Sequence, residues 1–282
     1  MRPQRFRMVA LLALLSLASL LGAQRRDPGQ SHSSSASPVT APPAGAVIGP
    51  LSMIHPPAPD HAFPNGETYS YFAEWRIWTA GTVKLGISND SSGQKVHGSA
   101  DSLGVVSALY PVHDRFDSIF DKASFCSQNL KKHIEEGFRA HDSLITYNYQ
   151  RRKSILDETN LKTKERKRVE NDIPGCVTDV VSGLYYLGAQ PLIPGASYRF
   201  PINDGGQTVE VQAKVEAKEI LKLPAGTFNS IRVSSEVVSG PLSKRGKVWI
   251  WYSDDSRRIP VQMRGRMFWG TLTFKLQQIE NK

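Results

Sequence analysis

The stretch that decides the fold is Gly246-Lys247-Val248-Trp249-Ile250-Trp251-Tyr252-Ser253-Asp254-Asp255-Ser256-Arg257-Arg258-Ile259-Pro260-Val261-Gln262-Met263. Val248, Ile250 and Tyr252 share one face of an extended chain and the residues between them share the other, which is the period of two that a pleated strand requires. Short polar side chains at 253–256 favour a turn, because they hydrogen-bond to their own backbone. The alternation then resumes. The stretch predicts a β-hairpin whose first strand, apolar on both faces, lies near the middle of a sheet.

The same alternation recurs along the chain before this hairpin. Strands are predicted, in order, at 66–77, 82–89, 94–102, 113–121, 124–135, 138–152, 163–170, 197–202, 207–223 and 227–239, and three final strands complete the chain. A short helical turn is predicted at 103–110. Long helices do not alternate with the strands, which argues against a doubly wound parallel sheet. The pattern therefore predicts a mainly β protein built on an antiparallel sheet.

One segment departs from the period of two. Apolar residues follow Pro174 at helical spacing, at positions 177, 180, 181, 184, 185 and 187. This spacing is typical of an amphipathic helix. Pro174 suits the first turn of such a helix and Gly188 suits its end. We expect one principal helix at about 175–188, lying over one face of the sheet.

The N-terminus has the pattern of a secretory signal peptide. Three arginines within the first seven residues precede an uncharged run from Met8 to Ala23. The run is short for a spanning helix, which needs about 20 apolar residues. We predict cleavage after Ala23, no stable transmembrane segment after cleavage, and a periplasmic or secreted protein. An uncleaved anchor is the alternative. Gln24 stands where a lipoprotein would have its cysteine, so no lipid is attached there.

The mature chain divides into a tether and a domain. Residues 24–63 are rich in Ser, Ala and Pro and have few large apolar side chains. Such a segment buries too little surface to offset its ordering entropy, which predicts a disordered tether. An arm that packs on the domain through Leu51, Met53 and Ile54 is the alternative. Residues 64–282 then form one β-rich domain.

The charge balance is mildly basic. The net charge of +9 becomes +6 without residues 1–23, because three arginines and no acids are lost, leaving 32 basic against 26 acidic residues. The densest basic cluster lies at 162–168 and has no interleaved aromatic residues. Export argues against a nucleic-acid partner, so a solvated hairpin is expected there. Weak attraction to anionic lipid headgroups is a further possibility.

Residues with catalytic or metal-binding chemistry do not cluster in a recognisable motif. His113 with Asp117, and His133 with Glu135 and Glu136, are the nearest approaches to metal spacing, and surface ion pairs are the favoured explanation for them. Asp254 and Asp255 precede two arginines in a predicted turn, where capping groups and ion pairs are expected. We therefore predict no catalytic residues, no metal site and no cofactor.

The aromatic residues suggest a different kind of site. Tryptophans on the predicted strands occupy both parities, so both faces of the sheet carry bulky groups. One face is the core beneath the helix. The other is predicted to line a groove for an apolar ligand, formed by Trp78, Trp249, Trp251 and Trp269. Ordinary core on both faces is the alternative.

The mature chain has two cysteines. Export places Cys126 and Cys176 in an oxidising compartment, where thiols tend to pair. A disulfide would fasten the predicted helix to a strand. Two separate buried thiols or a metal pair are the competing explanations.

Several segments together resemble one family. These are Gly66-Glu67 followed by Trp75 and Ala80-Gly81, then 178–186, then 223–228, then 249–261. In order and spacing they are similar to the exported bacterial family catalogued as domain of unknown function 3108. The resemblance implies a secreted or periplasmic β-rich protein of Gram-negative bacteria, without established catalytic residues. The family pattern is also similar to the lipoprotein-localisation carriers, which implies a single, strongly curved sheet, open or half-barrel, with one covering helix.

The leading functional hypothesis is a non-enzymatic periplasmic domain that binds an apolar molecule or a cell-envelope partner. An enzyme acting on an envelope polymer, or a purely structural interaction module, are the alternatives. An exposed aromatic concavity would favour a carrier, a polar pocket with converging His and Asp would favour an enzyme, and a flat apolar patch would favour an interaction module. The sequence does not specify the ligand or the oligomeric state.

Overall fold

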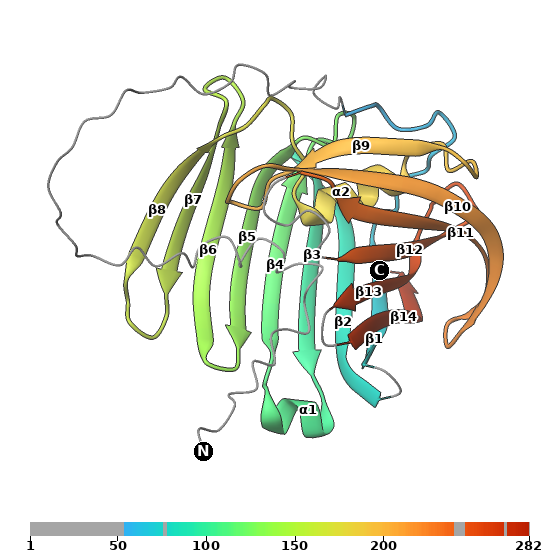
Figure 1. The fold of residues 1–282 in the computed structure, drawn as a ribbon, viewed down its shortest axis with the longest axis horizontal. Coiled ribbons are helices and arrows are strands. Elements are labelled where there is room, and N and C mark those ends of the chain that lie inside the picture. Colours follow the sequence, from blue (N-terminus) through green and yellow to red (C-terminus); the bar gives the residue numbers. More distant parts are fainter. Residues whose placement is uncertain (1–53, 76–77, 240–245, 268–269, 282) are drawn as a thin grey trace, which may run out of the picture.

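The computed structural model describes residues 54–75, 78–239, 246–267 and 270–281. Within these ranges the chain forms fourteen strands and two helices (Figure 1). In chain order they are β1 (Glu67–Trp75), β2 (Trp78–Asp90), β3 (Gly93–Ser102), α1 (Gly104–Leu109), β4 (His113–Phe120), β5 (Ser127–Glu136), β6 (Arg139–Asn148), β7 (Lys153–Asn160), β8 (Arg166–Asp172), α2 (Val180–Gly188), β9 (Ser197–Ile202), β10 (Val209–Leu223), β11 (Gly226–Val237), β12 (Lys247–Ser253), β13 (Pro260–Met267) and β14 (Gly270–Asn281).

The strands form a single antiparallel sheet in the order β8-β7-β6-β5-β4-β3-β2-β1-β14-β13-β12-β11-β10-β9. Strands that are consecutive in the chain pair with each other, except β8 and β9, which lie at opposite edges, and β1 pairs with β14 in the middle of the sheet. The sheet is therefore two meanders of hairpins joined at its middle. Hairpins need only short turns, which explains why alternation in the sequence was a sufficient guide to the fold.

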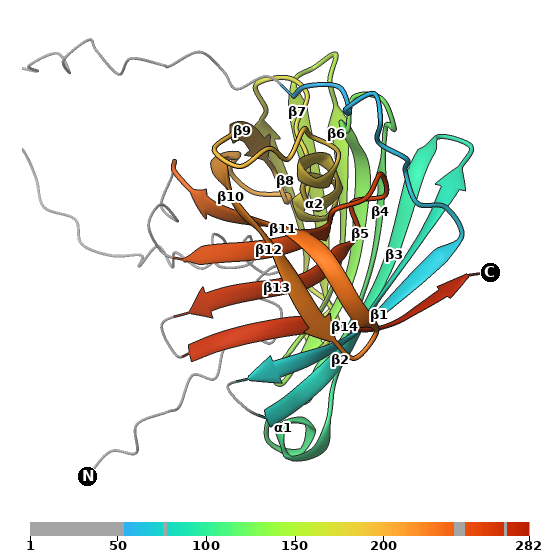
Figure 2. The same cartoon turned by 90° about the vertical axis from the view of Figure 1, so that its right-hand side faces the viewer.

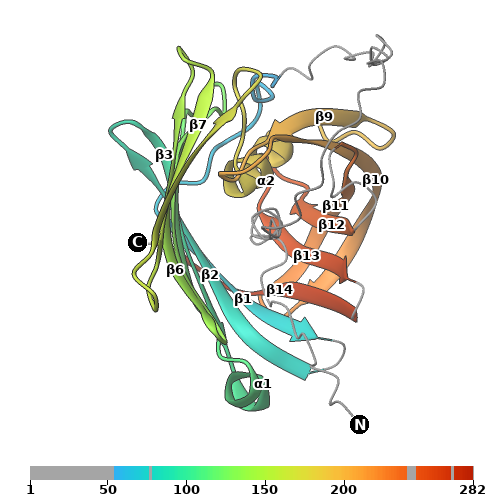
Figure 3. The ribbon, with the colours of Figure 1, turned by 60° about the vertical axis from the view of Figure 1, so that its left-hand side comes forward.

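The sheet is strongly curled, and α2 lies inside the curl (Figure 3). The edge strands β8 and β9 do not pair with each other, so the sheet is open. Buried tyrosines on the inner face place their hydroxyl groups against backbone carbonyls: Tyr71 Oη donates to Pro260 O at 2.9 Å, and Tyr252 Oη donates to Leu184 O at 2.7 Å. The prediction of one curved, open antiparallel sheet with a covering helix is confirmed.

A second layer covers part of the outer face. Strands β10 and β11 are long, and their register shifts between Val215 and Ala217. Beyond this bulge the hairpin bends across the outside of β12, β13 and β14 (Figure 2). Ala225 N donates to Leu276 O at 3.2 Å, which fixes the far end of the hairpin on β14. The outer face of the central strands is therefore packed in this region.

Two predicted boundaries were wrong. The strand predicted over 138–152 ends at Asn148, and β7 follows as a separate strand. The turn between them is formed by Asn148, whose Oδ1 accepts from Arg151 N at 2.9 Å, and by Arg152 at φ 51°. No Gly or Pro marks this turn.

The helix begins at Val180, not near 175, because Asp179 is its N-cap residue and Thr178 forms a bridge with Ile202 in extended conformation.

Residues 54–63 lie against the domain. Ala58 N donates to Ala189 O at 2.8 Å, and Ala62 N donates to Ser256 O at 2.9 Å. The Phe63 ring packs against the rings of Phe120 and Tyr185. Of the predicted tether, 24–53 falls outside the described residues, as does the predicted signal peptide. Its last ten residues form a packed arm, and Ile54 contacts the core as the alternative interpretation expected.

Candidate functional site

Helix α2 begins at a complete capping box. Asp179 Oδ1 accepts from the N–H groups of Val181 at 2.7 Å and Ser182 at 2.9 Å, while Asp179 N donates to Ser182 Oγ. Asp179 Oδ2 accepts from the hydroxyls of Ser118 on β4 and Ser127 on β5, at 2.8 and 2.7 Å. The buried carboxylate thus has four donors, and it ties the helix to the sheet.

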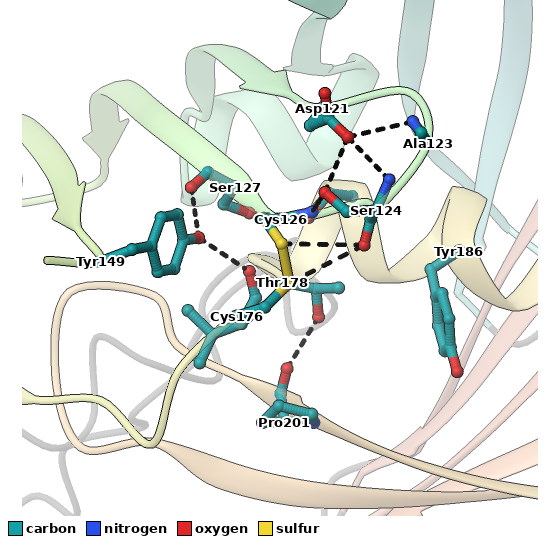
Figure 4. Close-up of a disulfide and its surroundings, with 12 residues drawn as sticks. Asp121, Ala123, Ser124, Cys126, Ser127, Tyr149, Cys176, Thr178, Tyr186 and Pro201 are labelled. Carbon is teal, nitrogen blue, oxygen red and sulfur yellow. Dashed lines mark hydrogen bonds between the residues drawn. A yellow bond between two sulfur atoms is a disulfide. The ribbon is translucent and has the colours of Figure 1, made fainter. Parts of the chain in front are cut away.

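The predicted disulfide between Cys126 and Cys176 is present (Figure 4). Its Cα atoms are 5.1 Å apart, and it joins the segment before β5 to the segment that leads into α2. Tyr149 Oη reinforces this connection by donating to Ser127 O at 2.5 Å. Thr178 Oγ1 donates to Pro201 O at 2.9 Å and so attaches the same segment to β9.

Aromatic rings fill the space between α2 and the sheet. The Tyr185 ring centroid lies 6.3 Å from that of Phe120 and 5.8 Å from that of Phe63. Phe120 and Phe125 stack with centroids 6.0 Å apart. All four rings belong to one packed cluster in which the partners are protein side chains. Helix α2 therefore has a structural role at this end of the curl.

The connection between β9 and β10 bridges the open side of the curl. Lys132 Nζ on β5 lies 2.6 Å from Asp204 Oδ2, and both side chains are at most 9% exposed. Burial raises the pKa of Asp204, and the Lys132 ammonium opposes this shift. Tyr147 Oη donates to Asn203 O at 2.7 Å beside the pair. Side chains thus connect the two arms of the sheet where its edge strands do not pair.

Two carboxyl groups share the interior near α1. Asp114 on β4 and Glu136 at the end of β5 are at most 3% exposed, and each influences the pKa of the other. Burial and the neighbouring Glu136 raise the pKa of Asp114 to about 8. Burial also raises the pKa of Glu136, against the opposing effect of Arg139. Asp114 Oδ2 and Glu136 Oε1 have no hydrogen-bond partner in the described part of the chain. Because two neighbouring carboxyl groups do not readily ionise together, we expect one proton to be held by this pair.

Strand parity along the chain gave a signal for the Lys132–Asp204 pair and for the Asp114–Glu136 pair. Asp114 has the same strand parity as Phe116 and Phe120, and Lys132 and Glu136 have the parity of Leu130. A charged residue in phase with the core face is unusual and indicates a buried polar contact. Sequence reasoning considered only motifs of known chemistry and therefore missed these three charged residues, as well as Asp204, which lies in a connection and has no strand parity.

The predicted tryptophan site is not assembled as one surface. Trp251 is 5% exposed, because the folded-back hairpin covers it: its Nε1 donates to Glu219, and Arg264 lies over its ring. Trp249 is half-buried under Lys247 on the same outer face. Trp78 is 68% exposed at the start of β2, and Trp269 falls outside the described residues. Trp251 therefore belongs to a packed layer, while ligand binding by the others stays a prediction.

The other candidate pairs are surface contacts. His133 Nε2 lies 3.4 Å from Glu135 Oε1, and its Nδ1 lies 2.6 Å from Asp142. His113 pairs with Asp101, not with Asp117. No group of three or more possible metal ligands occurs within the described ranges.

The predicted turn between β12 and β13 has the expected contacts. Asp254 pairs with Lys218 at 2.7 Å and with Arg258 at 3.2 Å. Asp255 Oδ1 accepts from the N–H groups of Arg257 and Arg258. Capping and ion pairing therefore account for both carboxylates.

Three parts of the fold that carry exposed apolar side chains lie at one end of the sheet, the lower end in Figure 1. They are the start of β2, α1 with the residue before it, and the turn between β5 and β6. We call this set of side chains the apolar rim; its members are Trp78, Leu103, Val105, Leu109 and Phe138. Val105 and Leu109 are more than 70% exposed, and Phe138 is 92% exposed. Helix α1 buries none of its six residues and has no side-chain cap.

Backbone contacts hold the rim together. Leu103 N donates to Ala80 O at 2.9 Å, which places the start of α1 beside β2. Gly137 N donates to Pro111 O at 2.8 Å, which places the turn that carries Phe138 beside the end of α1. Gly137 has φ 54°, and a Cβ there would lie 2.6 Å from the Tyr110 ring, so a larger residue would displace this turn. These contacts therefore hold the three parts of the rim in fixed positions relative to one another.

The fold defines a class of protein: a β-rich domain made of one curled, open antiparallel sheet. Residues 70–277 match the family described as protein of unknown function (DUF3108), and the chain belongs to that family. This confirms the resemblance seen in the sequence. No curated protein matches the chain.

Solved structures support the fold. A β-barrel-like DUF1849 protein of Brucella abortus superposes with a TM-score of 0.54 at 6% identity, covering 82% of this chain and all of that one. A candidate exported protein of Bacteroides fragilis with a YmcC-like fold has a TM-score of 0.36 at 12% identity, covering 82% of this chain and all of that one. A candidate lipoprotein of Parabacteroides distasonis has a TM-score of 0.32 at 11% identity, covering 82% of this chain and 99% of that one. The first likeness shows a shared fold.

Proposed function

We propose that this protein is an exported, non-enzymatic domain that binds an apolar component of the cell envelope through the apolar rim. The observation that carries the proposal is the rim itself. Five exposed large apolar side chains belong to the start of β2, to α1 with the residue before it, and to the β5–β6 turn, which lie at one end of the sheet. Contiguous exposed apolar surface is costly in water and marks binding sites. The other strongly exposed apolar residues, such as Ile193 and Ile220, lie in different parts of the fold.

Export is supported by two independent features. The first 23 residues have the charge and length of a signal peptide. The only two cysteines of the chain form a disulfide, which persists in oxidising compartments such as the periplasm. N-terminal sequencing of the mature protein should begin at Gln24, and a mature protein that begins at Met1 would contradict cleavage.

The arrangement of the apolar groups favours attachment through the exposed rim over enclosure of a ligand beneath α2. The space beneath α2 is occupied by stacked rings, and the rim lies at the other end of the sheet strands. The His–carboxylate pairs lie on the surface and have partners of their own. These features favour a binding domain over an enzyme acting on an envelope polymer.

The test uses Nile red, a neutral apolar probe, and a pair of matched variants. Val105→Ser/Leu109→Ser removes two rim side chains, and Ile193→Ser/Ile220→Ser removes two side chains of similar exposure elsewhere. We expect the wild type to enhance Nile red fluorescence and the rim variant to lose at least five-fold of its apparent affinity. The control variant should match the wild type. Absence of enhancement, or equal losses in both variants, would overturn the proposal.

A further inference from the structure

We infer that the ligand of the apolar rim is the surface of an anionic lipid bilayer, with the β7–β8 turn supplying the electrostatic attraction. This inference rests on the proposed function and adds the chemistry of the partner. It begins from the position of the basic cluster at 162–168. That cluster forms the turn between β7 and β8 and the start of β8, at the same end of the sheet as α1 (Figure 1).

The basic turn and the apolar rim are physically joined. Lys162 Nζ donates to Phe138 O at 2.9 Å and lies 6.0 Å from the centre of the Phe138 ring. Leu161 N donates to Ala140 O at 2.8 Å, which attaches the β7–β8 turn to the start of β6. Together with the contacts that link Phe138 to α1, these bonds make one continuous surface from β2 to β8.

The charge of this surface complements an anionic membrane. The exposed cations at this end are Arg139, Lys162, Lys164, Arg166, Lys167 and Arg168, of which Arg168 pairs with Asp157. The acidic residue within the turn is Glu165, whose Oε2 accepts from Thr163. Glu135 and Asp142 also lie on this half of the sheet, and both pair with His133. Positive charge therefore predominates beside the rim.

Apolar tips flanked by cations are suited to the boundary between headgroups and acyl chains. Each Lys or Arg near an anionic leaflet adds electrostatic attraction, and the apolar side chains enter the acyl region. Phe138 and Trp78 are the largest rim side chains, and aromatic rings favour this boundary. A protein partner would not require the cations and the apolar residues to lie on one edge in this arrangement.

The experiment measures flotation of the full mature protein with vesicles of phosphatidylcholine alone or with 30% phosphatidylglycerol. We expect at least ten-fold tighter binding to the anionic vesicles, and loss of this preference in 0.5 M NaCl. Lys164→Gln/Arg166→Gln/Lys167→Gln should remove the preference. The matched control, Lys84→Gln/Lys214→Gln/Lys222→Gln, removes three exposed lysines on other strands and should retain it.

The outcomes separate this inference from the proposed function. Equal binding to both kinds of vesicle, or no vesicle binding together with rim-dependent Nile red binding, overturns the anionic bilayer and leaves an apolar-binding rim. If the wild type binds neither vesicles nor Nile red, both the proposed function and the anionic bilayer are overturned. Equal effects of the two triple variants would show that net charge, and not the β7–β8 turn, produces the attraction.

Discussion

The two helices of this fold differ in burial, in capping and in covalent support. Helix α2 buries seven of its nine residues, has a capping box and stands beside a disulfide. Helix α1 buries none of its six residues, has no side-chain cap, and exposes Val105 and Leu109. Neither helix of the described ranges is long and apolar enough to cross a membrane. The comparison teaches that α2 holds the sheet in its curl, whereas the apolar residues of α1 contribute little to folding and are available for binding.

The largest expected effect is on the α2 side. Replacing both cysteines by alanine removes a link across 50 residues, and the chain-entropy model gives a loss of about 4 kcal/mol. Urea unfolding of the oxidised wild type and of Cys126→Ala/Cys176→Ala measures the difference. An unchanged free energy of unfolding would show that α2 is held without the link.

Asp179→Ala should lower the free energy of unfolding by about 3 kcal/mol, because the capping bonds are lost and two serine hydroxyls lose their buried acceptor. Asp121→Ala is the matched control: it removes a carboxylate that accepts from Ala123 N and Ser124 N in a more exposed turn. We expect the control to cost about 1 kcal/mol. Similar costs at both positions would contradict a special role for the α2 cap.

The buried carboxyl group of Asp114 makes the stability of the region near α1 depend on pH. Asp114, near α1, has its pKa raised to about 8, whereas its pKa in the unfolded chain is about 3.9. Between these values the folded chain holds a proton that the unfolded chain has released. Raising the pH therefore favours unfolding, by about 3 kcal/mol between pH 5 and pH 7 for one such group.

The matched variant is Asp114→Asn, which cannot ionise. Its free energy of unfolding, measured in urea at pH 5 and pH 7, should show a smaller decrease than the wild type. The difference between the two pH profiles reports the Asp114–Glu136 pair. Parallel profiles would contradict the shared proton.

The smallest expected effect is on the α1 side. Leu109→Ala should change the free energy of unfolding by less than about 0.5 kcal/mol, because the side chain is 72% exposed. Leu187→Ala in α2, where the side chain is 1% exposed, is the control and should cost about 3 kcal/mol. A large loss of stability at Leu109 would mean that α1 packs in the folded protein.

The fold was largely predictable because it depends on local patterns. Alternation along each strand, turn residues such as those at 253–256, and the helical spacing after residue 177 all act between near neighbours in the chain. The turn at 149–152 was missed because Asn148 and Arg152 form it without Gly or Pro. The helix start was misplaced because Asp179 gains its donors partly from β4 and β5, which the local sequence does not show.

The candidate site was less predictable because it depends on contacts between distant segments. The rim unites residues from 78 to 138, and the basic turn joins it through the contact of Lys162 with Phe138. The basic cluster itself was visible, and attraction to lipid headgroups was one expectation for it. The burial of Trp251 could not be predicted, because it follows from the β10–β11 hairpin folding over β12.

Hydrogen–deuterium exchange with and without anionic vesicles tests most directly the division between a structural α2 and a binding α1. We expect vesicles to slow exchange several-fold at residues 104–110 and 137–139 and to leave the amides of 180–188 unchanged. Protection at 180–188, or unchanged exchange in α1 under conditions where the protein floats with the vesicles, would contradict the account.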